Sequence, residues 1–272
     1  MFNSHDTLIS SLLFIIPLAV ACGSKPSPTD ISAIEKSDSV PKTVKQLVKA
    51  VATDDTLAFA NLVSYPLVRP YPLHDIESPE AMCRYYGTMV DDSLKHILTG
   101  SSPSDWEEYG WRGWSLSDGR YVWIDDNLYD VSYISHRENI MLDSITKLDM
   151  ASIDPSLRKG WLPVACFKGK YNGAVYRIDV SRSKNGSPTY RLVSYDAGTN
   201  LRGKPSSVMT GYKETEGTAG TITYQFSSPD GRRALFQNDV PDGSPYELIF
   251  YGASASEDTV VVDRAYWQDL IK

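Results

Sequence analysis

Cysteine and histidine are scarce in this chain of 272 residues, which has three of the first and four of the second. No C-x-x-C or H-x-x-x-H spacing occurs, so we predict no metal site. The stretch GASAS from Gly252 lacks the closing glycine of a G-x-S-x-G serine motif, and we find no phosphate-binding motif. These absences favour a protein with no catalytic residue and no cofactor.

Clusters of basic residues are also missing. Lysine and arginine together number 27 against 34 aspartates and glutamates, and the net charge is −7. A mildly acidic chain has no electrostatic attraction for a polyanion. We therefore expect no nucleic acid among its partners.

The one long apolar run, Leu8 to Ala21, is too short to span a membrane comfortably. As a helix it would measure about 21 Å at about 1.5 Å per residue, against a bilayer core of about 30 Å. It fits the apolar core of a secretory signal, followed by small residues for cleavage at Ala19, Val20 and Ala21. Cleavage after Ala21 would make Cys22 the first residue of the mature chain.

This arrangement resembles a bacterial lipoprotein signal, in which lipid is attached to a cysteine that follows small residues. The resemblance implies a signal peptide over residues 1–21, acylation of Cys22 and a tether over residues 22–40. It also implies a place in the cell envelope, lipid-anchored to a membrane and either periplasmic or surface-exposed. The alternatives are an ordinary secretory signal that happens to precede Cys22, or a start that is not a signal at all.

Beyond the tether, the sequence predicts an α+β protein of two domains. Apolar residues at helical spacing over 44–51 predict a first helix, and Asp54 or Asp55 fits the cap of a second. Prolines break the pattern from Ser64, and a third helix follows over 78–98. Alternating bulky residues flank the Asp118–Gly119 turn of a hairpin, which places the first domain at 41–138.

The rest of the chain reads as a linker over 139–159 and a β-rich domain over 160–272. Seven short runs of strand-forming residues, separated by turn residues, predict an all-β sandwich or a small barrel. A last helix is expected over 262–272. Cys83 and Cys166 either form one disulfide that bridges the two domains or remain as buried thiols.

The first domain is similar to the nuclear transport factor two-like (SnoaL-like, cystatin-like cone) superfamily over about residues 41–136. The likeness lies in the order of LVKAVATDDTLAFANLVSYPL, SPEAMCRYYGTMVDDSLKHIL, GWRGWSLSDGRYVWI and LYDVSYIS. It implies helices wrapped around a curved antiparallel sheet to form a cone with a pocket. Family members include isomerases, cyclases, dehydratases and binding modules, so the fold leaves the function open. The second domain shows no such likeness.

Several side chains are candidates for a site. The resemblance suggests a pocket in the cone, and the candidates to line it are Tyr65, Tyr85, Trp114 and Trp123. Trp114 and Trp123 belong to the dense aromatic cluster of 106–123, for which filling of the sheet core is the favoured interpretation. His74 and Asp75 could pair as a general base, but a solvated loop is the more ordinary interpretation. The doublets Glu107–Glu108 and Asp125–Asp126 are expected to be exposed charge.

Taken together, these features favour a membrane-anchored envelope lipoprotein that acts as a ligand-binding or protein-interaction module. Its partners would be a membrane, through the lipid, and a small molecule or a protein. The competing hypothesis is a small-molecule isomerase or hydrolase that uses the pocket of the first domain. A scaffold whose second domain docks a partner protein is a third.

We predict that the protein extracted from membranes lacks residues 1–21 and carries acyl mass on Cys22. The acyl chains would hold the protein in the membrane, because each buried methylene of a lipid chain adds about 0.8 kcal/mol of membrane affinity. Intact-mass spectrometry measures this directly. A Cys22→Ser variant should lose the acyl mass and leave the membrane fraction. A soluble wild-type product with unmodified Cys22 would refute the anchor.

Overall fold

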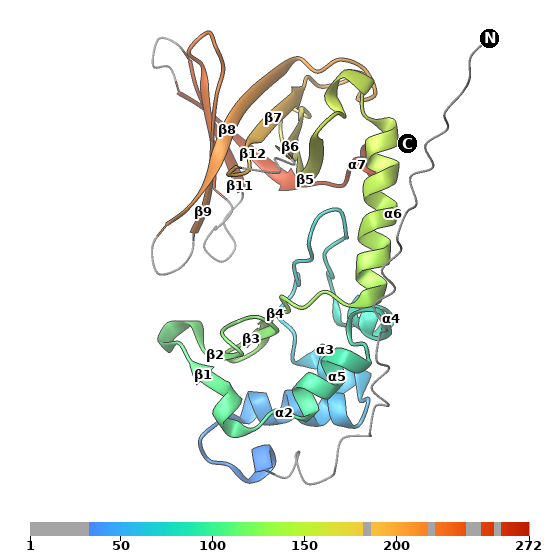
Figure 1. Cartoon of the computed structure of the whole chain (residues 1–272), viewed down its shortest axis with the longest axis vertical. Coiled ribbons are helices and arrows are strands. Elements are labelled where there is room, and N and C mark those ends of the chain that lie inside the picture. Colours follow the sequence, from blue (N-terminus) through green and yellow to red (C-terminus); the bar gives the residue numbers. More distant parts are fainter. Residues whose placement is uncertain (1–32, 182–185, 217–220, 238–245, 253–256, 272) are drawn as a thin grey trace, which may run out of the picture.

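The computed structural model describes residues 33–181, 186–216, 221–237, 246–252 and 257–271. The predicted signal peptide, Cys22 and most of GASAS lie outside these ranges. Two parts are joined by a long helix (Figure 1). We call residues 33–134 the helical domain and residues 161–271 the barrel domain. The architecture is therefore mixed α and β, as expected, with an eight-stranded closed barrel and a separate four-stranded sheet.

The helices of the helical domain, apart from the first, begin where side-chain oxygens accept free backbone N–H groups. They are α2 (Lys42–Ala52), α3 (Thr56–Asn61), α4 (Pro79–Met89) and α5 (Asp92–Thr99). Asp55 caps α3 and Ser78 caps α4, in agreement with the sequence. The single helix expected over 78–98 is two, because Val90 leaves the helical conformation and Asp91 accepts from the N–H of Leu94 to start α5.

A small antiparallel sheet packs against these helices. Its strands are β1 (Trp106–Glu108), β2 (Trp114–Leu116), β3 (Val122–Ile124) and β4 (Leu128–Asp130), in that order. The hairpin turn predicted at Asp118–Gly119 joins β2 to β3. Gly119 has a φ of +71°, and a Cβ there would lie 2.2 Å from Nε1 of Trp123. Glycine is therefore required both by the backbone and by the ring packed against it.

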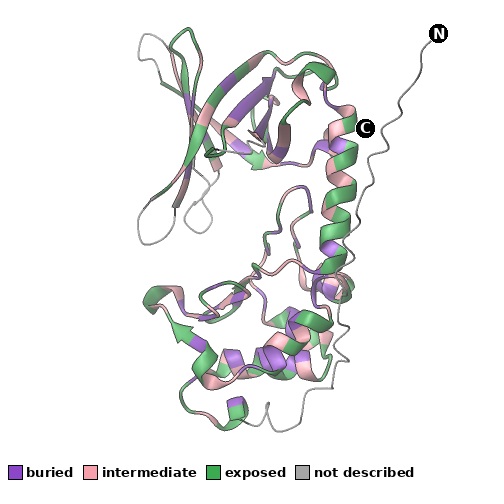
Figure 2. Cartoon of the chain, in the orientation of Figure 1, coloured by how far each residue is buried: buried purple, intermediate pink, exposed green. Residues whose placement is uncertain are grey.

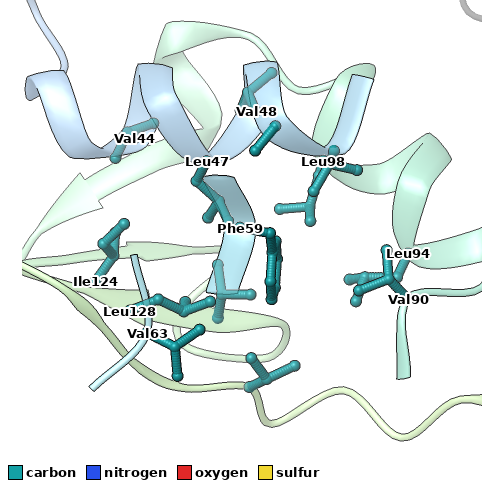
Figure 3. Close-up of a cluster of buried hydrophobic side chains, with 14 of the residues drawn as sticks. Val44, Leu47, Val48, Phe59, Val63, Val90, Leu94, Leu98, Ile124 and Leu128 are labelled. Atoms are coloured by element: carbon teal, nitrogen blue, oxygen red, sulfur yellow. The ribbon is translucent and has the colours of Figure 1, made fainter. Parts of the chain in front are cut away.

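The core of the helical domain lies between α2, α3, α5 and the sheet (Figure 3). Leu47 of α2 and Phe59 of α3 meet Ile124 and Leu128 from β3 and β4, and all four are at most 1% exposed. The helical spacing noted over 44–51 is therefore the buried stripe of α2.

The expected linker over 139–159 holds most of a helix that the sequence analysis did not predict, α6 (His136–Ser152). Its start is a capping box formed by Ser135 and Glu138. Its middle has no single apolar face, since Ile140 and Leu148 are 54% and 58% exposed. The apolar period on which such a prediction relies is therefore absent.

The barrel domain is a closed antiparallel barrel in which each strand pairs with the next along the chain, and the last pairs with the first. The sequence had left sandwich and barrel open. The strands are β5 (Trp161–Gly169), β6 (Val175–Ser181), β7 (Tyr190–Tyr195), β8 (Ser207–Glu216), β9 (Thr221–Ser227), β10 (Arg233–Gln237), β11 (Tyr246–Tyr251) and β12 (Glu257–Arg264).

The closing strand and the last helix correct the prediction for the end of the chain. Residues 262–264 were expected to be helical but belong to β12, and α7 is only Trp267–Leu270. Val260, Val261 and Val262 favour a strand because they are β-branched. Pairing of β12 with both β11 and β5 then closes the barrel.

Strands β6 and β7 are buried on both faces (Figure 2). Their outer face carries Asp179 between two arginines. Its Oδ1 lies 2.7 Å from Nε of Arg177, and its Oδ2 lies 2.7 Å from Nη2 of Arg191. Trp267 of α7 covers this group, with the Arg177 guanidinium 4.6 Å from its ring centroid. Helix α7 and the end of α6 thus form a second core outside the barrel.

A buried ion pair fixes the start of α6 to the proline-rich loop, residues 64–77. Nε and Nη2 of Arg69 each donate to the Glu138 carboxylate at 2.9 Å, and the two side chains are 1% and 0% exposed. The guanidinium also donates to the carbonyls of Val131 and Tyr133. Glu138 in turn accepts the N–H of Ser135 at 3.0 Å. One carboxylate therefore serves the ion pair and the helix cap together.

We predict that Glu138→Gln, which keeps the shape but removes the charge, destabilises the fold by about 3 to 5 kcal/mol, because Arg69 is left buried and unpaired. Urea unfolding followed by tryptophan fluorescence measures the change. Glu108→Gln, on the exposed β1, is the matched control and should change stability by less than about 0.5 kcal/mol. Equal midpoints for the two variants would contradict the role assigned to the pair.

Candidate functional site

The proline-rich loop reaches from the helical domain to the end of the barrel. The Asp75 carboxylate lies 3.3 Å from the Arg264 guanidinium. The backbone N–H of Asp75 donates to the Tyr266 hydroxyl at 2.8 Å. The ring of His74 stacks on Tyr266 with centroids 3.8 Å apart, and its Nε2 lies 3.3 Å from Asp269. The loop thereby holds the two domains in contact at the last residues of β12 and at α7.

A second set of contacts joins the loop, α6 and α7 around Asp149. Its carboxylate accepts from the Tyr71 hydroxyl at 2.8 Å and from Nε2 of Gln268 at 2.7 Å. Trp267 Nε1 donates to Ser152 Oγ at 2.7 Å. Burial raises the pKa of the Asp149 carboxyl, and these hydrogen bonds offset part of that effect.

Next to these contacts a cavity of about 280 Å³ opens between the two domains, and we call it the junction pocket. Its floor is the mouth of the barrel, where four rings from four strands come together: Phe167, Tyr224, Phe236 and Tyr246. The centroid of Phe167 is 4.4 Å from that of Phe236 and 5.9 Å from that of Tyr246. The barrel interior is therefore filled below the pocket, and the rings present an aromatic surface to it.

The rim of the junction pocket is polar. Arg69 and Tyr71 line it from the loop, Asp130 and Ser132 from the end of the small sheet, and Arg264 from β12. Cations and carboxylate are both present, so the pocket carries no large excess of one sign. An apolar floor with a few polar groups at the rim is the usual construction of a small-molecule site.

The thiol and the two arginines that line the junction pocket are either buried or already paired. Its thiol, Cys166, is fully buried, and burial raises the pKa of that thiol to about 12, so it stays protonated and unreactive. Within the described residues, no three side chains of His, Cys, Asp or Glu are grouped as metal ligands. Arg69 and Arg264 are already paired with Glu138 and Asp75.

The four pocket candidates named from the sequence do not line the junction pocket. Tyr65 donates to the Ala60 carbonyl at 2.8 Å, and Tyr85 donates to Glu138 at 3.1 Å. Both rings pack, partly buried, against the core of the helical domain, and so does Trp114. Trp123 lies on the other face of β3, where Tyr109 meets its ring edge-on at 5.1 Å.

Two further expectations need correction. His74 is exposed as expected of a loop residue, but the side chain of its neighbour Asp75 is only 9% exposed, because it is paired with Arg264. The two cysteines are free thiols, so the disulfide alternative is wrong. Cys83 lies in α4 and packs, partly buried, against the core of the helical domain, whereas Cys166 lies in β5 and is buried in the second core, outside the barrel.

Sequence reasoning missed the residues of the junction pocket. The aromatic residues of the floor alternate with outward residues along their strands, which is a signal of one buried face. That signal cannot say which strands are neighbours at the same barrel mouth. Arg69 lies between Pro66 and Pro70, and from the sequence it was only one residue of a helix-breaking stretch. No local pattern predicts its ion pair with Glu138, which lies far along the chain.

We predict that Asp149→Asn makes stability less dependent on pH. A raised folded pKa means that the native state binds more protons than the unfolded state, so the wild type loses stability as pH rises from about 3.9 to the raised pKa. The asparagine of the variant does not titrate. The free energy of unfolding of the variant, minus that of the wild type, should therefore grow across that window and then level off.

Urea unfolding of both proteins between about pH 4 and about pH 8 measures this difference. Asp143→Asn, on the exposed face of the same helix, is the control and should follow the wild type. An advantage of Asp149→Asn that shrinks with rising pH would contradict the prediction.

Comparison with protein-family models, with curated proteins and with solved structures finds no match to this chain. None of the helices in the described ranges has the length and apolar character needed to cross a bilayer. The function proposed below therefore depends on the geometry of the junction pocket.

Proposed function

We propose that this chain is an envelope lipoprotein, anchored through Cys22, that binds a small amphipathic ligand in the junction pocket. The apolar or planar part of the ligand would lie on the four aromatic rings of the floor. Its polar end would face Arg264 and Asp130 at the rim. Ligand binding, rather than catalysis, is the activity.

The observation that carries the proposal is the aromatic floor. Phe167 and Phe236 are at most 4% exposed, whereas Tyr224 and Tyr246 beside them are only partly buried. Large apolar rings that stay partly open to a cavity keep a hydrophobic driving force for a ligand that covers them. An eight-stranded barrel is also the size at which the interior is just filled or holds one small ligand.

Stability of the junction supports the same function. The rim residues are held by ion pairs and hydrogen bonds that involve both domains, among them Arg264 with Asp75 and Tyr71 with Asp149. Residues held in place before binding lose little freedom when the ligand arrives. The junction pocket therefore has the rigid walls that binding favours.

For residues 41–136 we keep the nuclear transport factor two-like cone as a proposal, which the packing of helices on an antiparallel sheet supports. The alternative function, an isomerase or hydrolase in such a cone, has less support. The hydroxyls of Tyr65 and Tyr85 are engaged in structural hydrogen bonds, and both rings pack against the core.

Titration with 8-anilinonaphthalene-1-sulfonate, an apolar anion with two ring systems, tests the proposal. The folded wild type should bind one molecule with saturable fluorescence. Tyr246→Ala removes a floor ring that lies 6.1 Å from Phe236, and should weaken binding about tenfold.

The control is Tyr171→Ala, which removes a tyrosine that is 83% exposed and lies outside the pocket. It should leave the affinity unchanged. Thermal unfolding of both variants shows that the fold is retained. Equal affinity of Tyr246→Ala and wild type, with both folded, would reject the junction pocket as the site. Native mass spectrometry of the protein extracted from its own membranes would then show whether a ligand accompanies it.

A further inference from the structure

The barrel has a second cavity at the mouth opposite the junction pocket, and we call it the distal mouth. It measures about 340 Å³ and is built entirely from the barrel domain. The floor is formed by Tyr176, Ser194, Met209 and Phe250, from β6, β7, β8 and β11. It shares no lining residue with the junction pocket, so it is a separate site.

Ser194 is the feature of the distal mouth that points to a ligand. The residue is 9% exposed, and its Oγ has no hydrogen-bond partner among the described residues. It pairs across the ladder with Tyr176, whose hydroxyl accepts from Nδ2 of Asn172 at 3.1 Å. A buried hydroxyl without a partner costs about 1 to 3 kcal/mol, which a ligand atom placed beside it would recover.

The rim of the distal mouth carries both signs of charge. Asp196 and Asp258 supply two carboxylates, and Arg232 supplies a guanidinium group. Arg233 also borders the cavity, but its side chain faces outward, with the guanidinium 5.5 Å from the centroid of the Tyr251 ring. Asp258 pairs with Phe250 across β11 and β12, which places it on the inward face of the barrel at the opening. Arg232 is held beside Asp230 at 2.8 Å, on the turn before β10.

Below the rim the cavity is apolar. Met209 is 3% exposed, and the ring of Phe250 lies 5.8 Å from that of Tyr176. A flexible thioether beside two rings suits an aliphatic or aromatic side chain of moderate size. Charged groups of both signs therefore surround an apolar depression that has one unsatisfied hydroxyl on its wall.

We propose that the distal mouth binds a small zwitterion with an apolar side chain, of the amino acid or dipeptide class. Its ammonium group lies against Asp258 and Asp196, and its carboxylate lies against Arg232. The apolar side chain fills the space above Met209 and Phe250. The Ser194 hydroxyl donates to a carbonyl oxygen of the ligand.

The charges exclude the simpler ligands. A plain anion would meet the two aspartates, and a plain cation would meet the Arg232 guanidinium. A zwitterion compensates both signs at once.

Isothermal titration of the full detergent-extracted chain with leucyl-leucine tests the proposal. N-acetyl-leucyl-leucine amide has the same side chains without either charge and should bind at least about tenfold more weakly. Asp258→Asn and Ser194→Ala should each weaken leucyl-leucine about tenfold. Asp263→Asn, on the exposed face of the same strand, is the matched control and should bind as the wild type does.

The outcomes separate this site from the junction pocket. Tyr246→Ala should leave leucyl-leucine binding unchanged, and Asp258→Asn should leave binding of the naphthalene sulfonate unchanged. Thermal unfolding shows which variants keep the fold. Absence of leucyl-leucine binding at about 10 mM, or equal binding of the uncharged analogue, overturns the proposal.

Discussion

The pairing of Arg69 with Glu138 is the interaction on which the rest of the structure depends. Two charges are removed from water here, and such burial is tolerated only when nearly every donor and acceptor finds a partner. Arg69 meets that condition through the Glu138 carboxylate and the carbonyls of Val131 and Tyr133. The pair fixes the proline-rich loop, the start of α6 and the chain after β4 in one arrangement.

The position of the barrel relative to the helical domain follows from that arrangement. The backbone of Arg69 continues the network, because its N–H donates to Asp75 at 2.8 Å and its carbonyl accepts from Arg264. Asp75 and Arg264 are themselves paired across the two domains. Since Arg69 and Arg264 also line the junction pocket, the contacts that hold the domains together also shape its rim.

Much of the fold could be read from local patterns. The caps at Asp55 and Ser78, the apolar stripe of α2 and the turn at Gly119 depend on neighbours within a few residues, and all appear as predicted. Helix α6 was not predicted because the middle of its sequence has no single apolar face. Strand β12 was not predicted, in part because it pairs with β5, which lies far from it in sequence.

The sequence by itself determined that this chain has a helical first part and a strand-rich second part, because periodicity, caps and turn residues act over short distances. Only the tertiary structure decided that the strands close into a barrel and which side chains meet at its two mouths. Ring closure brings Phe167 beside Phe236, and burial leaves the Ser194 hydroxyl without a hydrogen-bond partner among the residues that the structure describes. Neither event has a local signal, because each depends on which distant segments exclude water from the same place.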